Sequence, residues 1–280
     1  MSRVYRALEK AEEEKKRKGR QEAATKVFEE KAALKRETPI LKFDEEKVER
    51  LELPPQEETP VLIIPPHSFA GEQFRKLKAQ IFHRLPSPPH SILVTSTTPS
   101  EGKTMVAVNL ALAISKEIHR KAVLIDADMR KPSIHLDKSG DRKGLANYLS
   151  DGIPLSEVLI KSEVENLQII TAGPPPRKSA ELVGSKRMGE LMKSLKEIGD
   201  STYIIIDSPP VFSTVEPVLL SKMVDGVIFV VMAGRTPKEA ISRAIKNLDR
   251  EKIIGVVFNQ IDLKPSSYYS KYYHRYYRKY

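Results

Sequence analysis

Short runs of aliphatic and β-branched residues alternate with amphipathic stretches between residues 61 and 263. The runs show no polar–apolar alternation, which is typical of strands buried on both faces of a sheet. We expect strands at Ser91–Ser96, Ala122–Asp126, Leu167–Thr171, Tyr203–Asp207, Gly226–Val231 and Ile254–Asn259. The amphipathic stretches predict helices at Lys103–Lys116, Leu145–Ser150, Ser185–Ile198, Pro217–Met223 and Pro237–Leu248. This pattern predicts a doubly wound α/β fold with a mostly parallel sheet, whose ligand binds at the C-terminal ends of the strands.

The segments on either side of this region have no core-forming pattern. Half of residues 1–60 are charged, and Glu and Lys recur four residues apart, so we expect a solvated helix from Ser2 to about Arg36. It is either a charged arm without chemistry or a docking helix. Prolines at 54, 55 and 60 indicate an extended linker. Residues 264–280 form a separate tail, so we divide the chain at 60 and 263.

The composition excludes several classes of protein. The 280 residues include no cysteine, so disulfides, thiolate metal sites and cysteine nucleophiles are ruled out. The net charge of +10 favours an acidic partner, either nucleic acid, anionic lipid or a phosphorylated ligand. The N-terminus lacks the apolar segment of a secretory signal, and the longest apolar run, Val227–Ala233, is far shorter than the roughly 20 residues that span a bilayer. We therefore expect a cytoplasmic protein.

A phosphate-binding loop is the strongest chemical signal. An apolar strand, a loop of small residues and Gly102-Lys103-Thr104 lead into a predicted helix, although Thr97 stands where the common phosphate-loop pattern has its first glycine. Such a loop offers backbone N–H groups, a lysine for the terminal phosphates and a hydroxyl for magnesium. The alternative is a coincidental Gly-Lys-Thr at the start of a helix. The expected nucleotide-binding residues here are Pro99, Ser100, Glu101, Gly102, Lys103, Thr104 and Met105.

Carboxylates follow two further predicted strands. Asp126 and Asp128 end one apolar run, and Asp207 ends another. Carboxylates at these strand ends can hold hydrated magnesium or accept a proton, although each motif alone also fits an ordinary polar turn. Three such elements in order predict one site for a nucleoside triphosphate and Mg²⁺. Arg130 and Asn259, which also follow strands, are additional candidates for nucleotide binding.

These motifs together resemble the bacterial tyrosine kinases of capsular and exopolysaccharide synthesis. The resemblance covers about residues 68–280 and rests on Ser-Thr-Thr-Pro-Ser-Glu-Gly-Lys-Thr, Ile-Asp-Ala-Asp-Met-Arg-Lys-Pro, Ile-Asp-Ser-Pro-Pro and a terminal tyrosine cluster. It implies a fold of the P-loop NTPase type, close to the partitioning and cell-division ATPases. The family usually has glycine where this chain has Ser100.

The resemblance also implies roles for the matching positions. Lys103 would bind the β- and γ-phosphates of ATP, and Thr104 would ligate Mg²⁺. Asp126, Asp128 and Asp207 would complete the metal and catalytic cluster, with Asp128 taking the proton of the attacking tyrosine. Asn259 matches a position that often contacts the base in related folds.

Assembly and partners follow from the same resemblance. Glu72, Arg75 and Lys78 match a family pattern that pairs charges between subunits of a ring, with lysine in place of the final arginine. An intrahelical salt bridge is the alternative interpretation. The resemblance further implies activation at the inner face of the membrane by a separate chain-length protein, the polysaccharide co-polymerase. We expect no DNA partner.

The tail carries five Lys/Arg, no acidic residue and seven tyrosines. The tyrosines are Tyr268, Tyr269, Tyr272, Tyr273, Tyr276, Tyr277 and Tyr280. An aromatic stripe on a helix and stacking on single-stranded nucleic acid are possible interpretations, but autophosphorylation acceptors are favoured. We therefore expect an ATP- and Mg²⁺-dependent autokinase that phosphorylates the tail of a neighbouring copy. The alternatives are an ATPase switch, whose signature lysine is absent at Thr98, and a non-catalytic nucleotide-binding scaffold.

Overall fold

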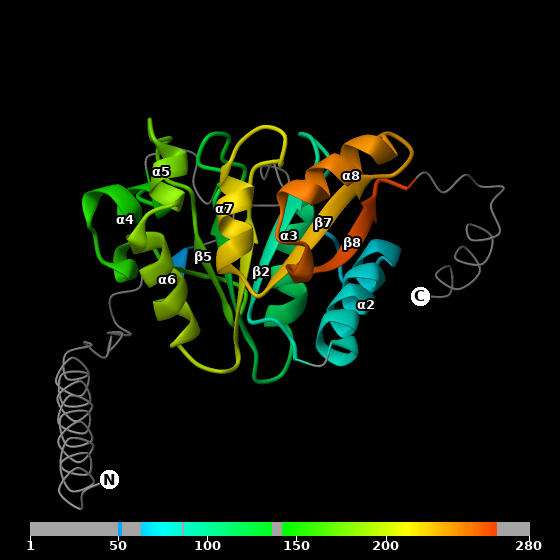
Figure 1. The fold of residues 1–280 in the computed structure, drawn as a ribbon. Helices are drawn as coiled ribbons and strands as arrows, with labels where there is room; N and C mark the ends of the chain where they lie inside the picture. The colour runs from blue at the N-terminus through cyan, green and yellow to red at the C-terminus, as the bar shows by residue number, and fades with distance from the viewer. Residues whose placement is uncertain (1–49, 52–62, 86, 136–141, 262–280) are drawn as a thin grey trace, which may run out of the picture. The chain divides into compact units, whose positions relative to one another are not determined.

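The computed structural model describes residues 50–51, 63–85, 87–135 and 142–261 (Figure 1). The predicted charged helix, most of the linker and the tyrosine tail lie outside these residues. The helices are α2 (Phe69–Arg84), α3 (Lys103–Ser115), α4 (Leu145–Asp151), α5 (Ser179–Val183), α6 (Lys186–Lys196), α7 (Glu216–Met223) and α8 (Lys238–Asn247). Short 3-10 turns lie at Leu155–Glu157 and Arg250–Lys252. Within the described ranges, no helix combines the length and the apolar character needed to cross a bilayer.

Within the described residues, eight strands form one sheet in the order β1-β4-β5-β3-β6-β2-β7-β8. The strands are β1 (Arg50–Leu51), β2 (Ser91–Ser96), β3 (Lys121–Asp126), β4 (Ile160–Ser162), β5 (Leu167–Ile170), β6 (Thr202–Asp207), β7 (Gly226–Met232) and β8 (Ile253–Asn259). Every neighbouring pair is parallel except β4 and β5. The predicted doubly wound, mostly parallel fold is confirmed, and all six predicted strands are present.

The core is divided between the two faces of the sheet, because successive strand residues point to opposite sides. Leu93, Ile125 and Phe229 pack on the face covered by α4, α5, α6, α7 and α8. Ile92, Leu124 and Ile228 pack on the opposite face with residues of α2 and α3. Figure 1 shows these two helical layers on either side of the strands. Burial on both faces explains why the strand sequences are apolar without alternation.

Helix α3 differs from its prediction as an amphipathic helix. Its buried residues occupy more than one side of the helix and include Val106, Val108, Leu110 and Ala111. Ile81 and Phe82 of α2 belong to the same apolar cluster as these residues. A helix that is covered by a second helix as well as by the sheet has little need for a polar face.

The ends of three central strands place the predicted chemistry together. Strand β6 lies between β3 and β2, and Asp126 is the register partner of Asp207. The loop from β2 to α3 begins at this same C-terminal edge. The sheet therefore brings both carboxylates next to the candidate phosphate loop, as expected for parallel strands.

A partly exposed polar contact joins the starts of β2 and β7 at the N-terminal end of the sheet. The Asp225 carboxylate accepts hydrogen bonds from the backbone N–H (2.9 Å) and the hydroxyl (2.7 Å) of Ser91, and Lys196 Nζ lies 2.6 Å away. Burial opposes ionisation of Asp225, but the contacts from Lys196 and Ser91 outweigh it and lower its pKa. The ionised carboxylate therefore stabilises the start of both strands.

We predict that Asp225→Asn lowers the free energy of unfolding at pH 7. Because 38% of the Asp225 side chain is exposed, solvent screening limits the expected loss to about 1 kcal/mol. A carboxylate with a lowered native pKa stabilises the fold above its unfolded pKa, and this contribution is lost as the pH falls. Urea unfolding at pH 7, 5 and 4 should show the difference between wild type and variant shrinking toward pH 4. A difference that grows on acidification contradicts this assignment.

Candidate active site

The phosphate loop runs from the end of β2 to the first turn of α3. Gly102 caps α3 in the left-handed conformation (φ 91°), and Ser100 also has a positive φ of 66°. A left-handed conformation costs a serine about 1 kcal/mol, a strain that a glycine at this position would not have. The first backbone N–H groups of α3 have no intrahelical acceptors, and the helix dipole places partial positive charge there. The start of α3 is therefore suited to bind phosphate.

The buried residue Glu101 fixes the conformation of the phosphate loop through hydrogen bonds. Its carboxylate accepts hydrogen bonds from the Thr98 backbone N–H (2.7 Å) and from the Thr236 hydroxyl, and its backbone oxygen accepts one from Asn259 Nδ2 (2.9 Å). Only 2% of Glu101 is exposed. The loop is thus fixed to the C-terminal ends of β7 and β8, and the side chains of Glu101 and Asn259 are engaged with protein atoms.

A cleft of about 420 Å³ lies above the loop. Among the residues predicted to bind nucleotide or metal, Pro99, Ser100, Gly102, Lys103, Thr104, Asp128 and Arg130 line it. Glu101, Met105, Asp126, Asp207 and Asn259 do not line it. Sequence reasoning missed Lys131, Ser133, Pro209, Pro210, Ser213 and Thr214 as lining residues. Lys131 lies within the first aspartate motif and Ser133 directly follows it, while the two prolines end the Ile-Asp-Ser-Pro-Pro motif. These motifs were the available signal, and nothing in the sequence marks Ser213 and Thr214.

Lys103 and Asp128 form an ion pair at the floor of the cleft. Lys103 Nζ lies 3.2 Å from Asp128 Oδ2 and 3.4 Å from Thr104 Oγ1. Both side chains of the pair are largely buried. The Lys103 ammonium therefore contacts the Asp128 carboxylate, which is expected to act as a base, and also lies where a phosphate group would bind.

Asp126 is occupied by the backbone of the following loop. One of its oxygens accepts a hydrogen bond from the Asp128 N–H, and the other accepts from the N–H groups of Ser133 and Ile134, all at 3.0 Å. Complete burial raises the pKa of Asp126 to about 6, although these three hydrogen bonds oppose the rise. Asp126 thus shapes the loop that carries Asp128 and Arg130.

Asp207 is in a different environment. Its carboxylate is fully buried, and neither oxygen has a described residue in hydrogen-bond geometry. Burial raises the pKa of Asp207 to about 8; the Lys103 charge and the nearby Thr104 hydroxyl oppose this rise, and Asp126 adds to it. A buried carboxylate without hydrogen-bond donors lacks compensation for its lost hydration.

The oxygen donors near the cleft fit a magnesium ion. The two unpartnered oxygens of Asp207 and the Thr104 hydroxyl are hard ligands of the kind that Mg²⁺ prefers. Across the part of the chain that the structure describes, no three His, Asp or Glu side chains converge into a metal-holding group. Magnesium commonly takes one or two protein ligands and completes its shell with phosphate oxygens and water.

Arg130 is held by two residues that the sequence did not indicate. Its Nε donates to Ser179 Oγ (2.9 Å) and to Glu216 Oε1 (3.0 Å). Ser179 belongs to α5 and Glu216 to the first turn of α7. Both are distant from Arg130 in the chain, and no local motif connects them.

The predicted assembly residues lie on α2. Arg75 Nε donates to Glu72 Oε2 (2.7 Å) on an exposed part of the helix, which is the intrahelical pair considered as the alternative. Lys78 is largely buried and pairs with Glu117 after α3. Their role in a ring stays a prediction.

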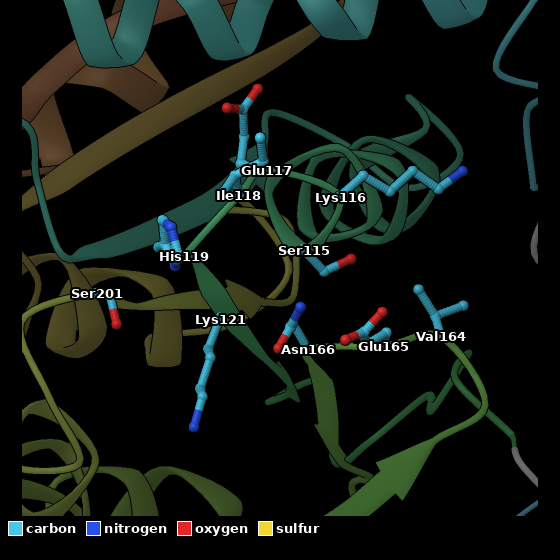
Figure 2. A pocket seen from close by; sticks show the side chains of 10 residues that line it. All are labelled: Ser115, Lys116, Glu117, Ile118, His119, Lys121, Val164, Glu165, Asn166 and Ser201. Atoms are coloured by element: carbon cyan, nitrogen blue, oxygen red, sulfur yellow. The ribbon is translucent and has the colours of Figure 1, made fainter.

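A larger cleft of about 820 Å³ lies at the opposite edge of the sheet. Figure 2 shows that it is formed by the loop from Ser115 to Lys121 and by residues 164–166, with the Lys116 and Lys121 side chains pointing away from one another. Its polar groups do not converge on a common point, whereas those beside the phosphate loop do. The smaller cleft is therefore the candidate active site.

The chain is similar to several known proteins. Residues 92–254 match the model of a family described as AAA domain. The chain is 32% identical to tyrosine-protein kinase YwqD of Bacillus subtilis, over 73% of this chain and 86% of that protein. It is 30% identical to the putative tyrosine-protein kinase CapB of Staphylococcus aureus, over 73% and 90%. The crystal structure of the chimerical protein CapA2B2 covers 70% of this chain and 87% of its own, with 31% identity and a TM-score of 0.65.

We predict that Gly102→Ala abolishes binding of Mg·ADP. A Cβ at this position would lie 1.9 Å from Asn259 Nδ2, and alanine disfavours a φ of 91°. Gly189→Ala is the matched control, because a Cβ there meets nothing within 4 Å and the residue lies inside α6. Calorimetric titration should show no binding for the first variant and wild-type affinity for the second. The control should also be more stable to urea by up to about 1 kcal/mol.

Proposed function

This chain belongs to the bacterial tyrosine-protein kinases of capsule biosynthesis, and we propose that it transfers the γ-phosphoryl group of ATP to the tyrosines of its own C-terminal cluster. We further propose that the transfer occurs in trans, from one copy to the tail of another. The Lys103–Asp128 pair beside the phosphate loop is the observation that carries this proposal, because it joins a phosphate-binding cation to a base.

The transfer itself uses the start of α3, Lys103 and Asp128. The N–H groups at the start of α3 and the Lys103 ammonium bind the β- and γ-phosphates. Once the lysine charge faces the phosphates, the Asp128 carboxylate is free to accept the proton of a tyrosine hydroxyl, whose ordinary pKa of about 10 calls for such a base. The phenol oxygen forms a bond to the γ-phosphorus while the bond from that phosphorus to the β-phosphate oxygen breaks, and ADP leaves.

Mg²⁺, held by Thr104 and Asp207, would neutralise charge on the transferred phosphoryl group. Asp126 contributes by fixing the loop that carries the base, through its three backbone hydrogen bonds. The partial positive charge at the start of α3 would bind the phosphate groups of the nucleotide.

Phosphorylation would also regulate assembly. The tail carries five basic and no acidic residues, so its charge is +5 before modification. Each phosphate adds about −1.5 to −2, and about four phosphates therefore make the tail negative. We propose that this reversal weakens contacts between copies in a ring, and that a membrane chain-length protein recruits and activates the kinase. In this way the chain would regulate polymerisation and export of a polysaccharide.

Mass spectrometry of the full chain after incubation with Mg·ATP tests the proposal. We predict phosphate on residues 268–280 of wild type and none in Lys103→Ala or Asp207→Ala. Lys186→Ala is the matched control, because the Lys186 side chain is 92% exposed on α6 and should leave phosphorylation unchanged.

A mixing experiment separates trans from cis transfer. A Lys103→Ala chain with an intact tail should be phosphorylated when an active chain whose tail tyrosines are replaced by phenylalanine is added.

Nucleotide hydrolysis without tail phosphate, alone or with the cytoplasmic segment of a membrane partner, identifies an ATPase switch and contradicts the proposal.

A further inference from the structure

A buried carboxylate outside the phosphate loop is not used by the chemistry described above. Glu216 is 1% exposed, at the start of α7, and Ser179 beside it is also buried. Moving a carboxylate out of water is unfavourable unless hydrogen bonds or charges compensate. One oxygen, Oε1, has such partners, whereas Oε2 has no described residue in hydrogen-bond geometry. The contacts of Glu216 are therefore concentrated on one of its two carboxylate oxygens.

The compensated oxygen belongs to a closed group of three side chains. The Ser179 hydroxyl donates to Glu216 Oε1 (2.6 Å) and accepts from Arg130 Nε (2.9 Å), which also donates to the same carboxylate oxygen (3.0 Å). Burial opposes ionisation of Glu216, but the hydrogen bond from Ser179, the nearby Thr214 hydroxyl, its own backbone N–H and the hydrogen bond from Arg130 together hold its pKa below the usual value. The carboxylate therefore faces Arg130 as a charge.

This group fixes one end of the Arg130 guanidinium and leaves the other open. The contacts use Nε, and the described residues supply no hydrogen-bond partner to the two terminal nitrogens. The Arg130 side chain is 55% exposed and lines the same cleft as Lys103 and Asp128. The terminal nitrogens of a guanidinium form a fork that matches two oxygens of a phosphoryl group.

The three residues of this group come from three different elements of the fold. Arg130 lies in the loop after β3, Ser179 at the first residue of α5, and Glu216 at the first residue of α7. Figure 1 shows α5 and α7 on the same side of the sheet, near its C-terminal edge. The start of α7 also favours an anionic side chain at Glu216.

We propose that Ser179 and Glu216 are positioning residues that direct the terminal nitrogens of Arg130 at a phosphoryl group in the cleft. The phosphoryl oxygens belong either to the γ-phosphate of ATP or to the phosphate of a modified tyrosine. Arg130 stays protonated throughout and forms no covalent bond. This inference rests on the kinase activity itself and is independent of which tyrosines are modified.

A double-mutant cycle on the full chain tests whether Glu216 acts through Arg130. The variants are Glu216→Gln, Arg130→Ala and their combination, with the initial rate of phosphotyrosine formation and the KM for ATP as readouts. We expect Arg130→Ala to lower the rate about 100-fold, as for loss of one transition-state donor, and Glu216→Gln about tenfold through loss of orientation. In the Arg130→Ala background, Glu216→Gln should have no further effect.

Equal losses in both backgrounds overturn the proposal, because a merely structural role for Glu216 does not depend on Arg130. Glu190→Gln is the matched control, since it makes the same chemical change in an exposed ion pair on α6. Ser179→Ala is the milder variant and leaves the carboxylate in place. It should lower the rate in the same direction with an unchanged thermal midpoint, which guards against an unfolded Glu216→Gln protein.

Binding measurements distinguish the two sources of the phosphoryl group. If Arg130 faces the γ-phosphate, Glu216→Gln weakens a non-hydrolysable ATP analogue about tenfold and leaves ADP unchanged. If it faces the product, the variant weakens a phosphorylated peptide of residues 264–280 and leaves both nucleotides unchanged. Unaltered binding of all three ligands contradicts the proposal. Absence of tail phosphate in wild type, with another tyrosine modified, would refute only the assignment of the tail as acceptor.

Discussion

Three carboxylates and one lysine meet at the C-terminal ends of β3 and β6, and the rest of the site depends on how their charges are compensated. Asp126 receives three backbone N–H groups, and Asp128 receives Lys103. Asp207 receives neither, although it is as deeply buried as Asp126. Because water is excluded, Asp207 keeps its proton until a bound cation compensates the charge of its carboxylate. The arrangement is suited to a protein that binds a metal–nucleotide complex.

The surrounding fold keeps these groups at their positions. Register pairing of Asp126 with Asp207 comes from a parallel sheet that is apolar on both faces. Glu101 ties the phosphate loop to Thr236 and Asn259, which lie after β7 and at the end of β8. Ser179 and Glu216 hold Arg130 from the other side of the cleft. Each of these contacts joins segments far apart in sequence, so the geometry depends on the complete sheet rather than on any one motif.

The sequence alone predicts the elements that depend on local residue patterns. The strand at Ser91–Ser96 has its predicted bounds, and the Gly102-Lys103-Thr104 loop lies at the start of α3. Strand β4 and helix α5 were missed because three and five residues are too short to show a period. The inward orientation of Glu101 and the contacts of Ser179 and Glu216 could not be predicted, since only the tertiary arrangement brings their partners near.

The pH dependence of stability tests the central claim most directly, with wild type compared to Asp207→Asn. If burial raises the pKa of Asp207 to about 8, the native state keeps a proton that the unfolded chain releases near pH 4, so wild type loses stability as the pH rises from 5 to 8. The variant lacks this loss, and Mg·ADP should stabilise wild type far more than the variant. We expect the difference in unfolding free energy to shift steadily in favour of the variant over this range without nucleotide. A difference independent of pH would contradict the account.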